Sequence, residues 1–403
     1  MVRYQALSEQ GALMYARKLT NLFAEHAQLE SREIGDGNLN LVFHIADLST
    51  GKSIILKQAL SYARVVGESW PLTLDRARIE SQALVIQSAH CPGMVPRVYH
   101  YDERLALTVM EDLSTHLIMR KGLVARERYP HFARHMGIFL ARTLYRTSDL
   151  ALPPQEKKRK AVQFSNPDMC KISEDLIFTD PYVDSERNHW NPRIADEVYL
   201  IWRSTLLKLE AAKLKGDFLT RTQALIHGDL HTGSIMVTDE DTKVIDPEFA
   251  FYGPMGFDIG ALFGNLLLNA ASHEGHTMDL WERESYQAYL LTMIEQIWSY
   301  FESEFRLLWD KESKERMAAV PGYVDAYLRG ILEDTAGYAG CEMIRRVIGL
   351  AHVADLESIQ DPVLRAKGER LALRIGQKLV LGRKQIHEAK DLTSLVGQVT
   401  GWA

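Results

Sequence analysis

The feature that most constrains this chain is residues 225–258, which read LIHGDLHTGSIMVTDEDTKVIDPEFAFYGPMGFD. Short apolar runs alternate there with acidic turns, which predicts short strands joined by tight loops. Asp229 lies in a glycine-bounded turn between two apolar runs, and Asp246 and Glu248 follow the next apolar run. One carboxylate could accept the proton of a hydroxyl group, and the other two could hold a divalent cation. This is the layout of a phosphoryl-transfer site.

The composition limits the partners that the chain is expected to have. It has 403 residues, of which 46% are apolar and 25% charged, enough for two or three lobes. A net charge of −6 argues against nucleic acid and anionic membrane surfaces. The three scattered cysteines predict neither disulfides nor a metal site. The first residues lack an apolar signal core, and no apolar stretch reaches the roughly 18 residues of a membrane span. We therefore expect a cytoplasmic protein.

The first part of the chain predicts one helix followed by strands. The first thirty residues read as an amphipathic helix, with Leu19, Leu22 and Phe23 on one face. Apolar and polar residues alternate in 39–44, and 53–58, on the other side of a turn, contains the apolar run Ile54-Ile55-Leu56. These two segments predict a β-hairpin.

The rest of the chain predicts a change from strands to helices. Residues 79–86 have helical spacing, 105–109 alternate, and from Leu113 onward the pattern is mostly helical. The clearest apolar stripe comprises Leu290, Ile294, Ile297, Phe301, Phe305 and Leu308. We expect an α+β fold of two lobes with a nucleotide in the cleft between them. The predicted boundaries are a small antiparallel-sheet lobe at 1–110, a hinge at 111–113 and a large helical lobe at 114–403.

Two features of the small lobe suggest contacts with phosphate groups. Gly35-Asp36-Gly37-Asn38 offers two residues without a Cβ and free N–H groups, although turn statistics favour a plain turn when the motif is taken alone. Lys57 ends an apolar strand and could pair with phosphates, or could be a surface lysine.

The helix after Lys57 carries Glu80, at a distance where the carboxylate partner of a lysine could fall. Arg76 and Arg78 are close to Glu80 along the same helix. A surface ion pair within the helix is therefore the competing interpretation.

Three further features, one at the end of the small lobe and two in the large lobe, have both a chemical and a structural interpretation. The strand ending at Glu111 could offer backbone groups to an adenine, or could be an ordinary strand end. His227 and His231 are four residues apart, but the glycines around them argue against a helical zinc site. For Asp258, at the start of an apolar helix, we favour an N-cap or loop-bracing role.

Arg345 and Arg346 lie in a helix with apolar residues on both sides. Adjacent helical residues diverge by about 100°, so both side chains cannot easily reach open solvent. At least one should be partly buried, and therefore paired with a carboxylate or facing an anion. An ion pair within the lobe and a contact with a bound anion are both open.

Taken together, these segments resemble a known family. HGDLHTGS followed by VIDPEFAFYGPMGFDIGALFGN is similar to the 5-methylthioribose kinases, within the superfamily of protein-kinase-like and aminoglycoside phosphotransferase-like enzymes. Ser234 stands where that superfamily usually has an asparagine, and Glu248 holds the second acidic position. Both departures are features of methylthioribose kinases, as are Gly35-Asp36-Gly37-Asn38 and the twin arginines Arg345-Arg346. The resemblance covers nearly the whole chain.

The resemblance implies a bilobal protein-kinase-like fold and transfer of the ATP γ-phosphoryl group to the 1-hydroxyl of 5-methylthioribose, in methionine salvage. Asp229 would be the catalytic base, with Arg345 and Arg346 at the substrate and the moving phosphoryl group. Mg²⁺ would be held by Asp246, Glu248 and Ser234. The family is typically homodimeric. The implied nucleotide-binding residues are Gly35, Gly37, Asn38, Asn40, Lys57, Glu80, Glu111, Asp112, Leu113, Asp246, Pro247 and Glu248.

Two other functions remain open on the sequence. One is another small-molecule kinase of the same superfamily, acting on an aminoglycoside, choline or homoserine. Pockets for aminoglycosides or choline must bind cations and should be rich in acids, whereas this chain offers Arg345 and Arg346. The other is an inactive nucleotide-binding scaffold, against which the presence of Lys57, Asp229 and Asp246 argues.

Overall fold

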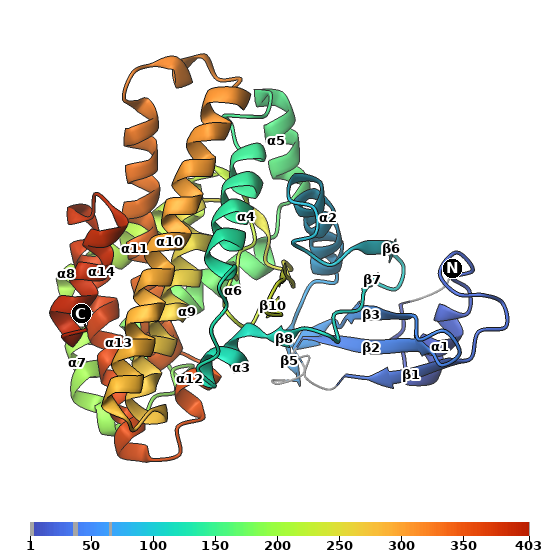
Figure 1. Cartoon of the computed structure of the whole chain (residues 1–403), viewed down its shortest axis with the longest axis horizontal. Coiled ribbons are helices and arrows are strands. Elements are labelled where there is room, and N and C mark those ends of the chain that lie inside the picture. Colours follow the sequence, from blue (N-terminus) through green and yellow to red (C-terminus); the bar gives the residue numbers. More distant parts are fainter. Residues whose placement is uncertain (1–3, 35–38, 64–66, 403) are drawn as a thin grey trace.

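The computed structural model describes residues 4–34, 39–63 and 67–402. Predicted nucleotide-site residues Gly35, Gly37 and Asn38 lie outside these ranges. Figure 1 shows a small lobe built on a sheet beside a larger helical lobe, which confirms the predicted α+β, two-lobed fold. In the part of the chain that is described, no helix is long and apolar enough to cross a membrane.

The small lobe is built on a five-stranded antiparallel sheet in the order β1-β2-β3-β7-β6. The predicted hairpin is confirmed, because β2 pairs with β3 with Phe43 opposite Leu56. Alternate residues of β2 and β3 are buried in a core that includes Phe43, Ile45, Ile54 and Leu56. The elements of this part are α1 (Glu9–Ala16), β1 (Leu29–Glu33), β2 (Asn40–Asp47), β3 (Ser53–Ala59), β4 (Tyr62–Ala63), β5 (Gly67–Pro71), α2 (Asp75–His90), β6 (Val98–Asp102) and β7 (Leu107–Glu111).

The predicted N-terminal helix is wrong in its extent, because α1 ends at Ala16. Leu19, Leu22 and Phe23 lie in a separate turn, in which the N–H groups of residues 22 and 23 donate to the Leu19 carbonyl at 2.8 and 3.1 Å. All three still pack on the sheet. One isolated turn places residues three and four apart on the same side, so spacing alone did not distinguish it from a longer helix.

The large lobe is mainly helical and contains two small sheets. Its helices are α3 (Met119–Val124), α4 (Phe132–Arg146), α5 (Pro154–Gln163), α6 (Pro167–Phe178), α7 (Ala195–Arg203), α8 (Thr205–Thr220), α9 (Met255–His276), α10 (Leu280–Glu312), α11 (Tyr323–Ile348), α12 (Ala354–Glu357), α13 (Pro362–Gly382) and α14 (Ala389–Thr400). Its strands are β8 (Leu117–Ile118), β9 (Ala224–Ile226), β10 (Ile235–Val237), β11 (Thr242–Val244) and β12 (Phe251–Gly253).

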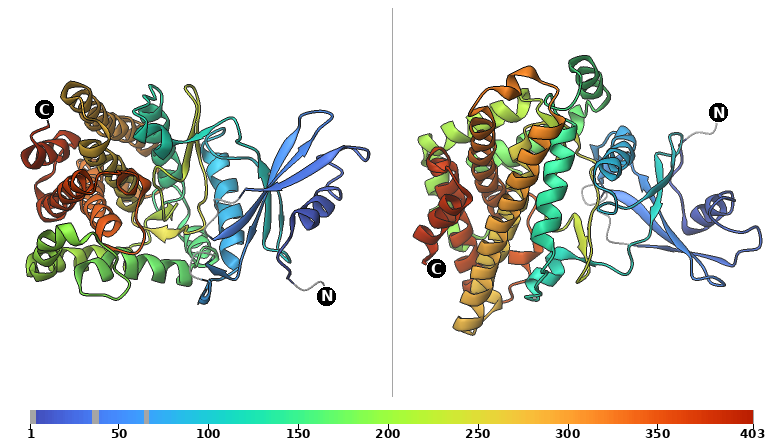
Figure 2. Two further views of the ribbon diagram at one scale, coloured as in Figure 1. Left: turned by 90° about the horizontal axis from the view of Figure 1, so that it is seen from below. Right: turned by 45° about the horizontal axis from the view of Figure 1, so that its top comes forward.

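Helix α9 is the centre of this lobe, because every residue from Met255 to Glu274 is buried. It packs most extensively on α11, and Figures 1 and 2 show the long helices of the lobe side by side. Gly256, Gly260 and Gly264 face α11, where an added Cβ would lie 2.7–2.9 Å from its backbone. The glycines therefore permit the close approach of the two helices.

Helix α10 carries the predicted apolar stripe, whose six residues are all buried. It packs along α4. The three cysteines are free thiols, as their scattered positions predicted.

Candidate active site

The loop between β9 and β10 holds Asp229 in a fixed backbone conformation. Gly228 has a φ of +83°, and a Cβ there would lie 2.2 Å from the carbonyl oxygen of Phe249. The carboxylate of Asp258 accepts hydrogen bonds from the His227 N–H at 2.6 Å and the Gly228 N–H at 3.0 Å. Asp258 therefore braces the loop as predicted; it lies in the first turn of α9, whose N-cap position is Pro254.

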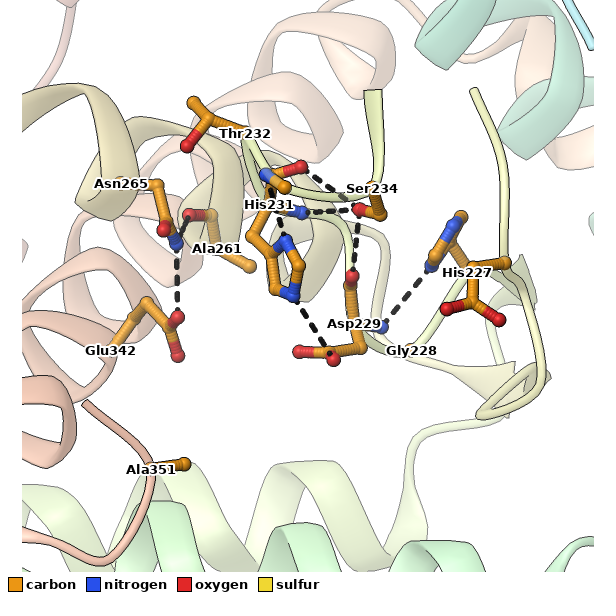
Figure 3. A network of polar contacts seen from close by, with 12 residues as sticks. His227, Gly228, Asp229, His231, Thr232, Ser234, Ala261, Asn265, Glu342 and Ala351 are labelled. Atoms are coloured by element: carbon orange, nitrogen blue, oxygen red, sulfur yellow. Dashed lines mark hydrogen bonds and ion pairs between the residues drawn. The ribbon is translucent and has the colours of Figure 1, made fainter. Parts of the chain in front are cut away.

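The two histidines of this loop use the same local device. His227 Nδ1 accepts from the Asp229 N–H at 3.3 Å, and His231 Nδ1 accepts from the Gly233 N–H at 3.0 Å. Because each Nδ1 accepts a hydrogen bond, each Nε2 is left to donate one. His227 Nε2 donates to the Ile245 carbonyl at 2.8 Å. His231 Nε2 points towards Asp229 Oδ2 at 3.4 Å (Figure 3). Both rings thus help to fix the position of Asp229.

Asp229 has cations on one carboxylate oxygen and an imidazole on the other. Its Oδ1 lies 3.2 Å from Arg345 Nη2 and 3.5 Å from Arg346 Nη2. Burial raises the pKa of this carboxyl, but His231 and the two arginines outweigh burial and hold the pKa well below its usual range. The side chain is 30% exposed, so a ligand can reach it.

Both arginines are buried, 7% and 6% exposed, and the ion pair within the lobe that the sequence left open is present. Each donates its Nε to Glu342, one turn earlier on α11, at 2.6 Å from Arg345 and 2.7 Å from Arg346. Each also reaches Asp229 with its other edge. The two side chains therefore form ion pairs within the lobe, and their contact with a bound anion stays a prediction.

Lys57 joins the small lobe to the acidic loop of the large one. Its Nζ donates to Glu80 Oε1 at 2.7 Å and is also hydrogen-bonded to Asp246. Burial lowers the pKa of Lys57, but the neighbouring carboxylates outweigh burial and raise it. Burial also raises the pKa of Glu80, to about 7. Asp246 has a φ of +69°, a strained conformation for a residue other than glycine.

Arg76 rules out the competing interpretation from the sequence, a surface ion pair with Glu80. It is fully buried and donates to Glu248 Oε2 at 3.1 Å and Asn40 Oδ1 at 3.1 Å. Asn40 Nδ2 donates to the same glutamate oxygen at 3.1 Å. Arg78 binds Asp75 instead, so no surface pair with Glu80 forms. Residues 76 and 80 share one helical face, and that face points at the lobe junction.

Comparison with known proteins identifies the family. A family model described as "Phosphotransferase enzyme family" matches residues 30–289. The methylthioribose kinase of Geobacillus sp. (strain WCH70) is 51% identical over 395 residues, covering 98% of this chain and 96% of that protein. The methylthioribose kinase of Bacillus pumilus (strain SAFR-032) is 46% identical over 98% of this chain and 97% of that protein. The chain belongs to the methylthioribose kinase family.

Among solved structures, an aminoglycoside phosphotransferase from Alicyclobacillus acidocaldarius has a TM-score of 0.48 and 13% sequence identity, covering 98% of each chain. The family is one of phosphotransferases, in agreement with the phosphoryl-transfer layout of residues 225–258.

The residues predicted to form the hinge, 111–113, lie where β7 leaves the sheet. Glu111 Oε2 accepts from the Arg97 N–H at 3.0 Å, and Asp112 accepts from the Ser53 hydroxyl at 2.7 Å. Asp112 also lies 3.1 Å from His44 Nε2, while Leu113 is buried. The contacts of Glu111 and Asp112 hold this segment against the sheet. Its roles as a hinge and as an adenine contact stay predictions.

Ser234 lies on the loop between β9 and β10, and Pro247 on the loop between β11 and β12. The Ser234 hydroxyl bonds the backbone of the Asp229 loop, accepting from the His231 N–H at 2.9 Å and lying 3.1 Å from the Asp229 carbonyl. The Ser234 carbonyl accepts from the Ile245 N–H at 2.9 Å, which ties the loops together. Pro247 is buried between the two acids. Metal binding by Ser234 stays a prediction.

Arg120, on α3, was missed by the sequence reasoning. Its Nη2 donates to Asn265 Oδ1 at 2.7 Å, and its Nε lies 3.0 Å from Asp355 Oδ2. A lone arginine in a short helix has no pattern that distinguishes it from a surface residue.

Over the described parts of the chain, no three or more His, Cys, Asp or Glu side chains form a metal-binding group.

Proposed function

We propose that this protein transfers the γ-phosphoryl group of ATP to the 1-hydroxyl of 5-methylthioribose, giving 5-methylthioribose 1-phosphate and ADP in methionine salvage. Membership of the methylthioribose kinase family supports this function. The observation that carries it is the meeting of two buried arginines at one oxygen of Asp229. A neutral sugar that becomes a phosphate suits a pocket that has both a base and cations.

The acceptor side can supply the groups that the reaction needs. The sugar oxygen would bond to the γ-phosphorus while the bond to the β–γ bridging oxygen breaks and ADP leaves. Asp229 would orient the 1-hydroxyl and accept its proton. Because the pKa of Asp229 is held well below its usual range, we expect that proton to move late, as the new bond forms. Arg345 and Arg346 would stabilise charge on the transferred oxygens.

The nucleotide would occupy the junction of the lobes. We infer that Lys57, positioned by Glu80, contacts the phosphates, and that Asn40 lines the same side. Glu111, Asp112 and Leu113 would line the adenine. Gly35, Gly37 and Asn38, outside the described residues, would complete the phosphate contacts.

Asp246 and Glu248 would hold Mg²⁺, with Pro247 fixing their spacing and Ser234 as a further ligand. The donor set fits, because Mg²⁺ takes one or two carboxylates and completes its shell with phosphate oxygens and water. Burial and the neighbouring Asp246 raise the pKa of Glu248, which marks an excess of negative charge at this place. When bound, the ion would neutralise charge on the β- and γ-phosphates.

We also propose that the enzyme is a cytoplasmic homodimer whose partners are small molecules, with no nucleic-acid or membrane partner. The division at 1–110, 111–113 and 114–403 is part of this proposal. Sedimentation of the purified protein with and without ATP tests the dimer.

The decisive test is a coupled ADP-release assay over methylthioribose, ribose, choline, homoserine and an aminoglycoside. We expect turnover on methylthioribose to exceed that on the other acceptors by orders of magnitude. Activity only on choline, homoserine or the aminoglycoside would overturn the assignment, and ADP release with no acceptor at all would point to a nucleotide-hydrolysing function.

A further inference from the structure

Glu342 occupies a special position relative to the two active-site arginines. It precedes Arg345 by three residues and Arg346 by four on α11. At 3.6 residues per turn, its direction from the helix axis falls between theirs, about 60° from one and about 40° from the other. A side chain at position 342, one turn before the two arginines, can therefore reach both guanidinium groups.

The contacts show how the two edges of each guanidinium are divided. The Nε edges are held by Glu342, Oε2 receiving Arg345 at 2.6 Å and Oε1 receiving Arg346 at 2.7 Å. The Nη2 groups reach Asp229 at the longer distances of 3.2 and 3.5 Å, and that of Arg345 also lies 3.5 Å from Glu342 Oε1. Charge-assisted bonds near 2.7 Å are the stronger ones. The arginines are thus anchored on Glu342 and only loosely held by Asp229.

Glu342 is itself fixed by the interior of the lobe. It is 3% exposed, and its Oε1 also accepts from Asn265 Nδ2 at 2.9 Å, which Figure 3 shows beside it. Its Cβ lies 3.1 Å from the position that a Cβ on Gly264 would take. Burial raises the pKa of Glu342, but the two arginines outweigh burial and lower it to about 2. The carboxylate is therefore a permanent anion.

We propose that Glu342 is a positioning residue for phosphoryl transfer: it holds the Nε edges of Arg345 and Arg346 so that their Nη edges stay turned towards Asp229 and the acceptor pocket. This inference deepens the proposed function and rests on it. When a phosphoryl group enters, the loosely held Nη groups can move from Asp229 to its oxygens while the Nε bonds persist. Without Glu342, both side chains would be free to turn fully towards Asp229.

The test is steady-state kinetics of the full-length enzyme and its Glu342→Gln variant. Glutamine keeps the size but presents an NH₂ group to one of the two Nε–H donors, so one arginine loses its anchor. We expect kcat on methylthioribose to fall about 10²-fold, as a small misplacement near the reacting atoms can do. The KM for ATP should stay within about threefold, because the substitution leaves unchanged the interactions that bind ATP equally in the ground state and the transition state. Glu342→Asp, which keeps the charge but withdraws it by one methylene, should lose about tenfold in kcat.

The matched control is Glu369→Gln on α13. Like Glu342, Glu369 is buried and binds an asparagine, Asn191 at 2.7 Å. Among the described residues it binds a single arginine, Arg365 at 2.8 Å, and it lies outside the site. Its kcat should stay within about twofold of wild type, as expected for a residue remote from the reacting atoms. Combining Glu342→Gln with Arg345→Lys should be far less than additive, because the glutamate acts through the arginine.

The outcomes are distinguishable. If the wild-type enzyme does not phosphorylate methylthioribose, the proposed function fails before Glu342 is tested. If wild type is active and Glu342→Gln keeps the wild-type kcat, the positioning role is overturned. The same holds if Glu342→Asp keeps the wild-type kcat. Equal losses in kcat, ATP affinity and thermal stability, or additive effects with Arg345→Lys, would also overturn it, since they indicate a general structural role.

Discussion

The proposed nucleotide side and the proposed acceptor side of the site differ in their charge balance and in the lobes that build them. On the nucleotide side three carboxylates, those of Glu80, Asp246 and Glu248, face two cations, Lys57 and Arg76. On the acceptor side the carboxylates of Asp229 and Glu342 face Arg345 and Arg346. By formal charge, the nucleotide side therefore has one carboxylate without a matching cation, whereas the charges on the acceptor side are balanced.

The difference suggests how each side is used. Lys57 and Arg76 come from the small lobe and bind acids of the large lobe, so a change in the angle between the lobes breaks these contacts. All four acceptor-side groups come from the large lobe and keep their geometry when the lobes move. We expect the nucleotide side to be completed by a metal ion and lobe closure, whereas the acceptor side is pre-organised.

The largest effect should come from Asp229→Ala. Removing the carboxylate takes away the proposed proton acceptor and also leaves Glu342 as the carboxylate partner of two buried arginines. We expect turnover on methylthioribose to fall by about 10³- to 10⁴-fold, with ATP affinity unchanged by calorimetry. A rate within a few-fold of wild type would show that Asp229 is not the base, and loss of ATP binding would show that the two sides are not independent.

The next largest effect should come from Arg345→Ala and Arg346→Ala, each expected to lower kcat on methylthioribose by about 10²- to 10³-fold. The KM for ATP should change little, because the Arg345 and Arg346 contacts with Asp229 and Glu342 lie on the acceptor side. Arg374→Ala is the matched control, since Arg374 pairs with Glu197 but is 58% exposed. Unchanged kinetics in both site variants would remove the arginines from the mechanism.

How much of this site could be predicted depended on how local each signal was. Asp229, Asp246 and Glu248 stand in one short segment whose turns and strands are encoded by their immediate neighbours, so the sequence predicted them. The β2–β3 hairpin and the stripe on α10 are local in the same sense.

Arg76 and Glu342 could not be interpreted in this way. Arg76 lies four residues before Glu80, which is the spacing of an ordinary surface pair, yet its partner Glu248 is 172 residues away. Arg345 lies three residues after Glu342, and the second anion that it reaches, on Asp229, is 116 residues away. Spacing along a helix shows which residues share a face, but only the packing of distant elements shows what that face meets.

A smaller and differently distributed effect is expected from Lys57→Met, which breaks a contact between the lobes. The KM for ATP should rise about tenfold, because a phosphate contact and its pairing with Glu80 are lost. The KM for methylthioribose should stay within about twofold. Lys384→Met is the matched control, at a surface lysine that pairs with Glu333 and is 63% exposed. Equal increases in both KM values would contradict the separation of the two sides.

The smallest effect, a shift in pH dependence, tests the charge balance of the acceptor side most directly. The arginines help to hold the pKa of Asp229 well below its usual range, so the carboxylate stays ionised as the pH falls. Removing one cation in Arg345→Ala disfavours the ionised form and raises that pKa. The acid limb of kcat/KM for methylthioribose should therefore move to higher pH, by about one unit. Arg374→Ala should leave the limb in place. A limb that stays put in Arg345→Ala, or moves to lower pH, would show that Asp229 does not depend on this arginine for its charge.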